Sequence, residues 1–150
     1  MRRYRLGLRC LWVLTWFVVL GLEPAPLAAA ASGEVCFDVE LRGGTTKICA
    51  DVRVNPRAPR FGTTILAVHG LTETAAAWGP LTDAIFSDRE LRSRVRRVIA
   101  IDLPGHGDSP MPVGLPGALF GELTIDDNVS VLIQSIRILR ELGLGSSMIF

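Results

Sequence analysis

The chain has 150 residues, of which 49% are apolar and 21% charged, and its formal net charge is +1. That length suits one domain with a buried core. Residues 32–150 carry 12 basic and 14 acidic residues, so no positive excess indicates nucleic-acid binding. Two separated histidines, with no Cys-x-x-Cys pair and no glycine-rich phosphate loop, predict neither a metal site nor a cofactor.

Residues 1–31 have the pattern of a secretory signal peptide. Four arginines precede an apolar run from Leu11 to Leu22, and Ala-x-Ala sequences follow between Ala28 and Ala31. The run is short for a bilayer-spanning helix, which needs roughly 20 residues. We expect export to the periplasm or the extracellular space, with membrane contact only through this peptide before its cleavage. An uncleaved membrane anchor is the alternative.

Two alternating runs, Val35–Leu41 and Lys47–Val54, predict a β-hairpin around Gly43-Gly44 with one apolar and one polar face. Cys36 and Cys49 fall on the polar face of the two facing strands. In an oxidising compartment such a pair tends to close, so we expect a disulfide, with two free thiols as the alternative.

The turn of this hairpin decides whether the cysteines face each other. A two-residue Gly43-Gly44 turn would place them diagonally, about 7–8 Å apart, which is too far for a disulfide. A turn centred on Arg42-Gly43, or a β-bulge, would remove the offset.

Three short apolar runs, Ile65–Val68, Val98–Ile101 and Ser147–Phe150, predict strands that are buried on both faces. Such strands are typical of parallel sheets, in which helices connect one strand to the next. Between the first two runs we expect a helix from Trp78 to about Ser87, followed by a charged, surface-exposed stretch at residues 88–97 that includes five arginines. The core-facing side of this helix would carry Trp78, Leu81 and Ile85.

A second helix is predicted between the last two runs, after a long Gly- and Pro-rich loop at residues 103–122. Thr124 and Asp127 have the spacing of a capping box, and Gly143 marks the end of the helix. Its apolar residues recur at three- and four-residue steps and predict a core-facing stripe of Ile125, Val129, Leu132, Ile133, Ile136, Leu139 and Leu142.

The segment Val68-His69-Gly70-Leu71, with Trp78 a short distance further on, resembles the oxyanion-hole segment of the α/β-hydrolase fold superfamily. The second motif, Asp102-Leu103-Pro104-Gly105-His106-Gly107-Asp108-Ser109, resembles the next strand end and loop of the same superfamily. The resemblance implies an α/β fold with a mostly parallel sheet that opens with an antiparallel hairpin. It also implies that Ile65–Val68 lies between the other two parallel strands.

The resemblance assigns roles to several residues. The backbone N–H of Leu71 would donate to the oxyanion of a reacting carbonyl, in a loop shaped by His69 and Gly70. Three more residues would form a loop near the site: Gly105, His106 and Gly107. No Gly-x-Ser-x-Gly motif occurs in the chain, and the resemblance places the nucleophile directly after the third parallel strand.

Residues 32–150 are therefore expected to be the N-terminal part of a hydrolase domain, ending after the third parallel strand. The nucleophile, the acid and the catalytic histidine would lie beyond Phe150, and Ser109 is the alternative nucleophile. The expected function is hydrolysis of a small-molecule carboxylic ester by an exported serine enzyme, with the 150-residue chain inactive by itself. The alternatives are an epoxide hydrolase or dehalogenase type with an Asp nucleophile, and a non-catalytic binding relative.

Overall fold

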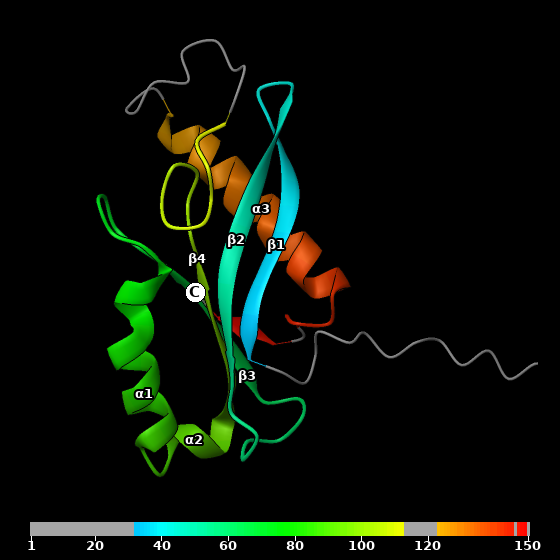
Figure 1. Cartoon of the computed structure of the whole chain (residues 1–150). Coiled ribbons are helices and arrows are strands. Elements are labelled where there is room, and N and C mark those ends of the chain that lie inside the picture. The colour runs from blue at the N-terminus through cyan, green and yellow to red at the C-terminus, as the bar shows by residue number, and fades with distance from the viewer. Residues whose placement is uncertain (1–31, 113–122, 146, 150) are drawn as a thin grey trace, which may run out of the picture.

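The computed structural model describes residues 32–112, 123–145 and 147–149 (Figure 1). The expected signal peptide, most of the second half of the long loop, and Phe150 lie outside these residues. The described part is a five-stranded sheet in the order β1-β2-β4-β3-β5, with helices on both faces. In chain order the elements are β1 Gly33–Leu41, β2 Gly44–Val54, β3 Thr63–Val68, the 3₁₀ turn η2 Ala75–Trp78, α1 Gly79–Ser87, α2 Leu91–Arg94, β4 Val95–Ile101, α3 Ile125–Glu141 and β5 Met148–Ile149.

The parallel part of the sheet is β4-β3-β5, and the predicted central position of β3 is confirmed. Strand β2 joins this part antiparallel to β4, so the hairpin extends the sheet at one side. The expected α/β architecture is therefore present as a mixed sheet, in which an antiparallel hairpin precedes three parallel strands. None of the helices in the described residues is long and apolar enough to cross a membrane.

The hairpin turns at Arg42-Gly43, and the prediction of a turn around Gly43-Gly44 is wrong by one residue. Both turn residues have positive φ, 49° for Arg42 and 81° for Gly43, which is what a two-residue hairpin turn requires. Leu41 then pairs with Gly44, and this register brings Cys36 directly opposite Cys49. The expected disulfide between these two cysteines is present.

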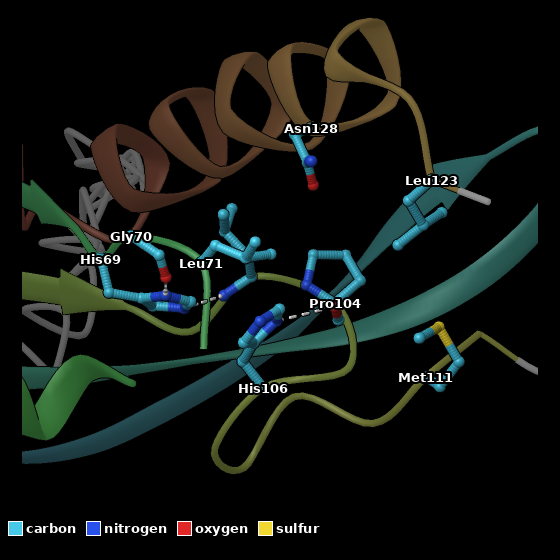
Figure 2. Close-up of a pocket in the computed structure, with 9 residues that line it drawn as sticks. His69, Gly70, Leu71, Pro104, His106, Met111, Leu123 and Asn128 are labelled. Atoms are coloured by element: carbon cyan, nitrogen blue, oxygen red, sulfur yellow. Dashed lines mark hydrogen bonds between the residues drawn. The ribbon is translucent and has the colours of Figure 1, made fainter. Parts of the chain in front are cut away.

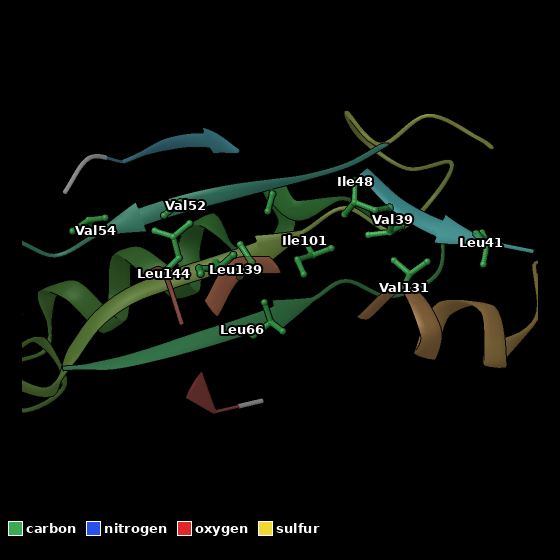
Figure 3. Packing of buried hydrophobic residues seen from close by; sticks show 12 residues of the cluster. Val39, Leu41, Ile48, Val52, Val54, Leu66, Ile101, Val131, Leu139 and Leu144 are labelled. Carbon is green, nitrogen blue, oxygen red and sulfur yellow. The ribbon is translucent and has the colours of Figure 1, made fainter. Parts of the chain in front are cut away.

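Two apolar layers, one on each face of the sheet, make up the core. On one face, sheet residues such as Ile48, Val52 and Ile101 pack against Val131 and Leu139 of α3 (Figure 3). On the other face, the smaller side chains of β3 and β4 pack against η2 and α1, with Ile85 buried there. Because each face carries its own helices, β3 and β4 are covered on both sides, as their continuous apolar runs predict.

Helix α1 turns a different side to the core from the one expected. Leu81 is 50% exposed, whereas Thr82 is buried and donates its hydroxyl to the Trp78 carbonyl. The helix begins only at Gly79, after the tighter 3₁₀ turn that contains Trp78. Trp78 still packs against the same apolar cluster as Ile85, so of the three expected core-facing residues only Leu81 points outward.

Helix α3 has the predicted cap but only part of the predicted apolar face. Thr124 accepts from the Asp127 N–H and the Asp127 carboxylate accepts from the Thr124 N–H, which completes a capping box. The core side is centred on Val131, so Ile125, Val129 and Ile133 are exposed, contrary to the expected stripe. Positions 129 and 133 lie two residues from Val131, about 200° around the helix, and therefore face outward.

Strand β4 begins at Val95, three residues earlier than expected. Arg97, placed by the sequence analysis on a solvated surface, is only 3% exposed, while Arg94 is exposed and pairs with Glu90. β4 has strand neighbours on both sides, and Arg97 pairs in register with Val54 and Thr64. Side chains of a central strand stand perpendicular to the sheet, so their exposure depends on what packs over that face, and the charge pattern alone could not reveal this burial.

Candidate active site

Two loops meet at one edge of the sheet, where the neighbouring parallel strands β3 and β4 end. Val68 pairs with Ile101, so the residues that follow them, His69 and Asp102, lie side by side. The carboxyl edge of parallel strands is where α/β proteins bind ligands. Both resembling motifs therefore contribute to a single place in the fold, although 32 residues separate Gly70 from Asp102 in the sequence.

His69 links the two loops. Its ring is buried, with Nδ1 2.7 Å from the carbonyl oxygen of Gly70 and Nε2 3.0 Å from the backbone nitrogen of Leu103. The Leu103 N–H donates to Nε2, so the ring proton sits on Nδ1 and donates to the Gly70 carbonyl. Both ring nitrogens are thus engaged in holding backbone, which suits the predicted loop-shaping role of His69 and Gly70. That role stays a prediction.

Leu71 stands at the surface of this edge. Its side chain is 81% exposed, and no described residue accepts a hydrogen bond from its backbone N–H. The next residue, Thr72, has φ 69°, a conformation that a β-branched residue rarely adopts. Strain of this kind is concentrated at functional sites. The loop therefore leaves the Leu71 N–H without an acceptor among the described residues, at the position where the resemblance implies an oxyanion donor.

Asp102 holds the base of both loops. Its carboxylate is 5% exposed, and it accepts from the N–H of Ala75 at 2.6 Å and from the N–H of Asp108 at 3.2 Å. Gly107 packs directly against this carboxylate with φ 50°, and a Cβ at that position would clash with it. The glycine is thus required by the close approach of the Asp102 carboxylate.

The Gly105–Gly107 loop packs against His69. Gly105 has φ 80°, and His106 donates its backbone N–H to the Leu103 carbonyl, which closes a tight turn. The His106 ring centroid lies 4.8 Å from that of His69, and its Nδ1 lies 3.2 Å from the Pro104 carbonyl oxygen. His106 therefore contacts His69 directly, and the near-site role of Gly105, His106 and Gly107 stays a prediction.

Ser109 has the geometry of a structural residue. It is 1% exposed, its Oγ donates to the Asp102 carbonyl at 2.7 Å, and the same Oγ accepts from the Cys49 N–H at 2.8 Å. A nucleophile needs an accessible oxygen next to a base. The burial and the two hydrogen bonds argue against Ser109 as the alternative nucleophile. They also tie the disulfide-bonded strand β2 to the second loop.

A cavity of about 280 Å³ opens beside the two loops (Figure 2). Its lining combines residues of both motifs with residues further along the chain: His69, Gly70, Leu71, Leu103, Pro104, His106, Met111, Leu123 and Asn128. Sequence reasoning missed Met111, Leu123 and Asn128 as site residues. No local signal marks them, because only the packing of α3 over the sheet brings its first turn to this edge.

A second hollow behind the loops is acidic. It is lined in part by Glu34, Asp51, Asp102 and Asp108. Desolvation, followed by the charge and hydrogen bonding of Asp108 and the charges of Asp102 and Asp51, raises the pKa of Glu34. The sulfur atoms of Cys36 and Cys49 lie within 4.8 Å of the Glu34 carboxylate. They form a disulfide, however, and so offer no thiolate to a metal ion.

Comparison with known proteins agrees with this geometry. The model of the alpha/beta hydrolase family matches residues 65–148, which is more than half of the chain. The match begins in β3, includes both loops and α3, and ends in β5. The chain therefore belongs to the alpha/beta hydrolase family. No curated protein matches it.

Solved structures of similar fold include a probable hydrolytic enzyme from Pseudomonas aeruginosa, with a TM-score of 0.53 and 22% identity over 75% of this chain and 31% of that one. An epoxide hydrolase mutant from Aspergillus niger has a TM-score of 0.48 and 21% identity over 74% of this chain and 26% of that one. A haloalkane dehalogenase mutant from Agrobacterium tumefaciens has a TM-score of 0.48 and 20% identity over 75% and 31%. The chain thus spans about a quarter to a third of the structures that it matches.

Proposed function

We propose that these residues form the oxyanion-binding part of an exported hydrolase that acts on small-molecule carboxylic esters through a serine nucleophile. The observation that carries the proposal is Leu71, an exposed residue that lines the cavity and whose backbone N–H donates to no described residue. Such a donor stabilises the negative charge that develops on oxygen when an ester carbonyl is attacked. Residues 32–150 would be the first part of the hydrolase domain, and the nucleophile would come from residues outside this chain.

The chemistry assigned to this chain is electrostatic. Attack on the ester carbonyl converts it into a tetrahedral oxyanion, which would accept a hydrogen bond from the Leu71 N–H. The loop cannot adjust freely, because His69 fixes the carbonyl of Gly70 and Asp102 fixes the N–H of Ala75 on either side of it. A donor held in this way needs little reorganisation during the reaction.

The nucleophile can be tested with a fluorophosphonate probe, which reacts with activated serines, together with hydrolysis of p-nitrophenyl butyrate. We expect the product of the native gene to react with the probe and to hydrolyse the ester, and the 150-residue chain alone to do neither. Labelling of the 150-residue chain that disappears in Ser109→Ala would overturn the assignment of the nucleophile. A native product that gives neither reaction would instead indicate a non-catalytic binding relative.

The oxyanion role can be tested with two variants of the native gene product at one position. Leu71→Pro removes the backbone N–H, whereas Leu71→Ala keeps it and removes most of the exposed side chain. Loss of one oxyanion donor lowers the rate by about 10²–10³-fold. We expect a loss of that order for Leu71→Pro and a change of less than about threefold for Leu71→Ala, because the backbone performs the function. Equal losses in both variants would contradict the role of the N–H.

Export is the second part of the proposal. The pattern of residues 1–31 and the disulfide between Cys36 and Cys49 both suit a protein that matures in an oxidising compartment. N-terminal sequencing of the exported protein should find cleavage near Ala30 or Ala31. An intact Met1 in the membrane fraction would instead indicate an anchored protein.

A further inference from the structure

Among the described residues that line the cavity beside Leu71 there is no Lys, Arg, Asp or Glu. Five of these lining residues are apolar: Leu71, Leu103, Pro104, Met111 and Leu123. Transferring an ion into such surroundings without a counter-charge is strongly unfavourable. The lining therefore favours an uncharged, mainly apolar ligand.

The polar side chains of the lining differ in what they can offer to such a ligand. Both ring nitrogens of His69 are engaged with backbone groups of Gly70 and Leu103. His106 directs Nδ1 at the Pro104 carbonyl. Asn128 is different, because its carboxamide makes no hydrogen bond to any residue of the described ranges, although it has one acceptor and two donor hydrogens.

Asn128 reaches the cavity from the first turn of α3. Figure 2 shows its side chain pointing from the helix toward the space between Leu71 and Pro104. Of the other polar side chains of this turn, Thr124 and Asp127 form the capping box, Asp127 also binds Arg42, and Asp126 is exposed. Asn is a poor helix former, and Thr124 and Asp127 already cap α3, so neither helix propensity nor capping accounts for an Asn at position 128.

We propose that Asn128 is a specificity-determining residue: the cavity takes an uncharged, mainly apolar group that carries one hydroxyl or carbonyl oxygen, and the Asn128 carboxamide binds that oxygen. The inference rests on the proposed function in that the group would be part of the ester substrate. Ligand binding itself does not require turnover, so it can be tested on the 150-residue chain.

Three probes of nearly the same shape separate the contributions. Benzyl alcohol, ethylbenzene and benzylammonium differ only in an OH, a CH₃ or an NH₃⁺ group on the same benzylic carbon. Their dissociation constants would be measured by ¹H–¹⁵N NMR titration, which also reports the side-chain NH₂ signals of Asn128. The variants are Asn128→Leu, which keeps the shape of the side chain, and Arg137→Leu, a control at an exposed position of the same helix that does not line the cavity.

We expect benzylammonium to bind the wild-type chain at least about tenfold more weakly than benzyl alcohol. Benzyl alcohol, but not ethylbenzene, should shift the Asn128 NH₂ signals. In Asn128→Leu the affinity for benzyl alcohol relative to ethylbenzene should fall about fivefold, as expected for one neutral hydrogen bond. Arg137→Leu should leave that ratio unchanged.

Equal binding of benzylammonium, or unmoved Asn128 NH₂ signals at saturation with benzyl alcohol, would overturn the inference without any variant. An unchanged affinity ratio in a folded Asn128→Leu would do the same. If the selectivity is found but the native gene product hydrolyses no ester, the inference about the cavity stands and the proposed function fails. If hydrolysis is found without the selectivity, only the inference fails.

Discussion

Replacing Asp102 should destabilise the fold, by an amount that the contacts of its carboxylate allow us to estimate. The carboxylate accepts from the N–H groups of Ala75 and Asp108. In Asp102→Ala the N–H of Ala75 stays buried without an acceptor, because Ala75 is 6% exposed, and such a loss costs about 1.5–3 kcal/mol. Asp108 is exposed, so water can replace the longer hydrogen bond at a cost of about 0.5–1 kcal/mol.

We therefore expect Asp102→Ala to lower the free energy of unfolding by about 2–4 kcal/mol. Asp102→Asn keeps one acceptor oxygen for one of the two N–H groups but turns an NH₂ group toward the other. The free energy of unfolding should therefore fall by less than in Asp102→Ala, about 1–2 kcal/mol. Asp51→Ala is the matched control, since Asp51 lines the same acidic hollow but is exposed. It should change stability by no more than about 0.5 kcal/mol.

Urea denaturation followed by circular dichroism gives the three free energies, provided that the m-values agree. Hydrogen exchange of the Ala75 amide adds a local measure, because this proton should exchange faster in Asp102→Ala than in Asp51→Ala. A loss below 0.5 kcal/mol (about the error of such measurements) in Asp102→Ala would refute the reasoning. An equal loss in Asp51→Ala would show that the charge of the hollow matters, and not the hydrogen bonds of Asp102.

Three further predictions concern parts of the molecule outside the loops. Hydrogen bonds from Arg42 and then Thr124 hold the pKa of Asp127 far below its usual range, so the stability that the ionised Asp127 contributes should be lost as the pH falls below about 4. In Asp127→Asn, the free energy of unfolding measured with urea should therefore depend less on pH in this acidic range. Desolvation, and then the nearby carboxylate of Asp108, raise the pKa of Glu34, so its ionised form opposes folding. Glu34→Gln should therefore raise stability at pH 7, and the gain should vanish below about pH 4, where Glu34 is protonated in both states. Intact mass should increase by about 2 Da on reduction of the disulfide, whereas alkylation of two thiols in the non-reduced protein would contradict its presence.

The elements that local patterns specify could be predicted from the sequence. The capping box of α3 depends on two residues three apart, and the alternation of the hairpin strands and the apolar runs of β3 and β4 are equally local. The edge where the candidate site lies could also be predicted, since parallel strands that end at His69 and Asp102 must bring the following loops together. The turn at Arg42-Gly43 could be predicted too, because a turn at this position places Cys36 directly opposite Cys49, as a disulfide requires.

The tertiary structure decided which side chains are covered. By itself, the sequence determined where strands and helices form, because periodicity, caps and turns act between residues close in the chain. It could not determine that Arg97 is buried between two strands or that Ile125 is exposed, because both depend on how distant elements pack. Asn128 became a site residue for the same reason, since only the packing of α3 over the sheet brings its first turn to the cavity beside Leu71.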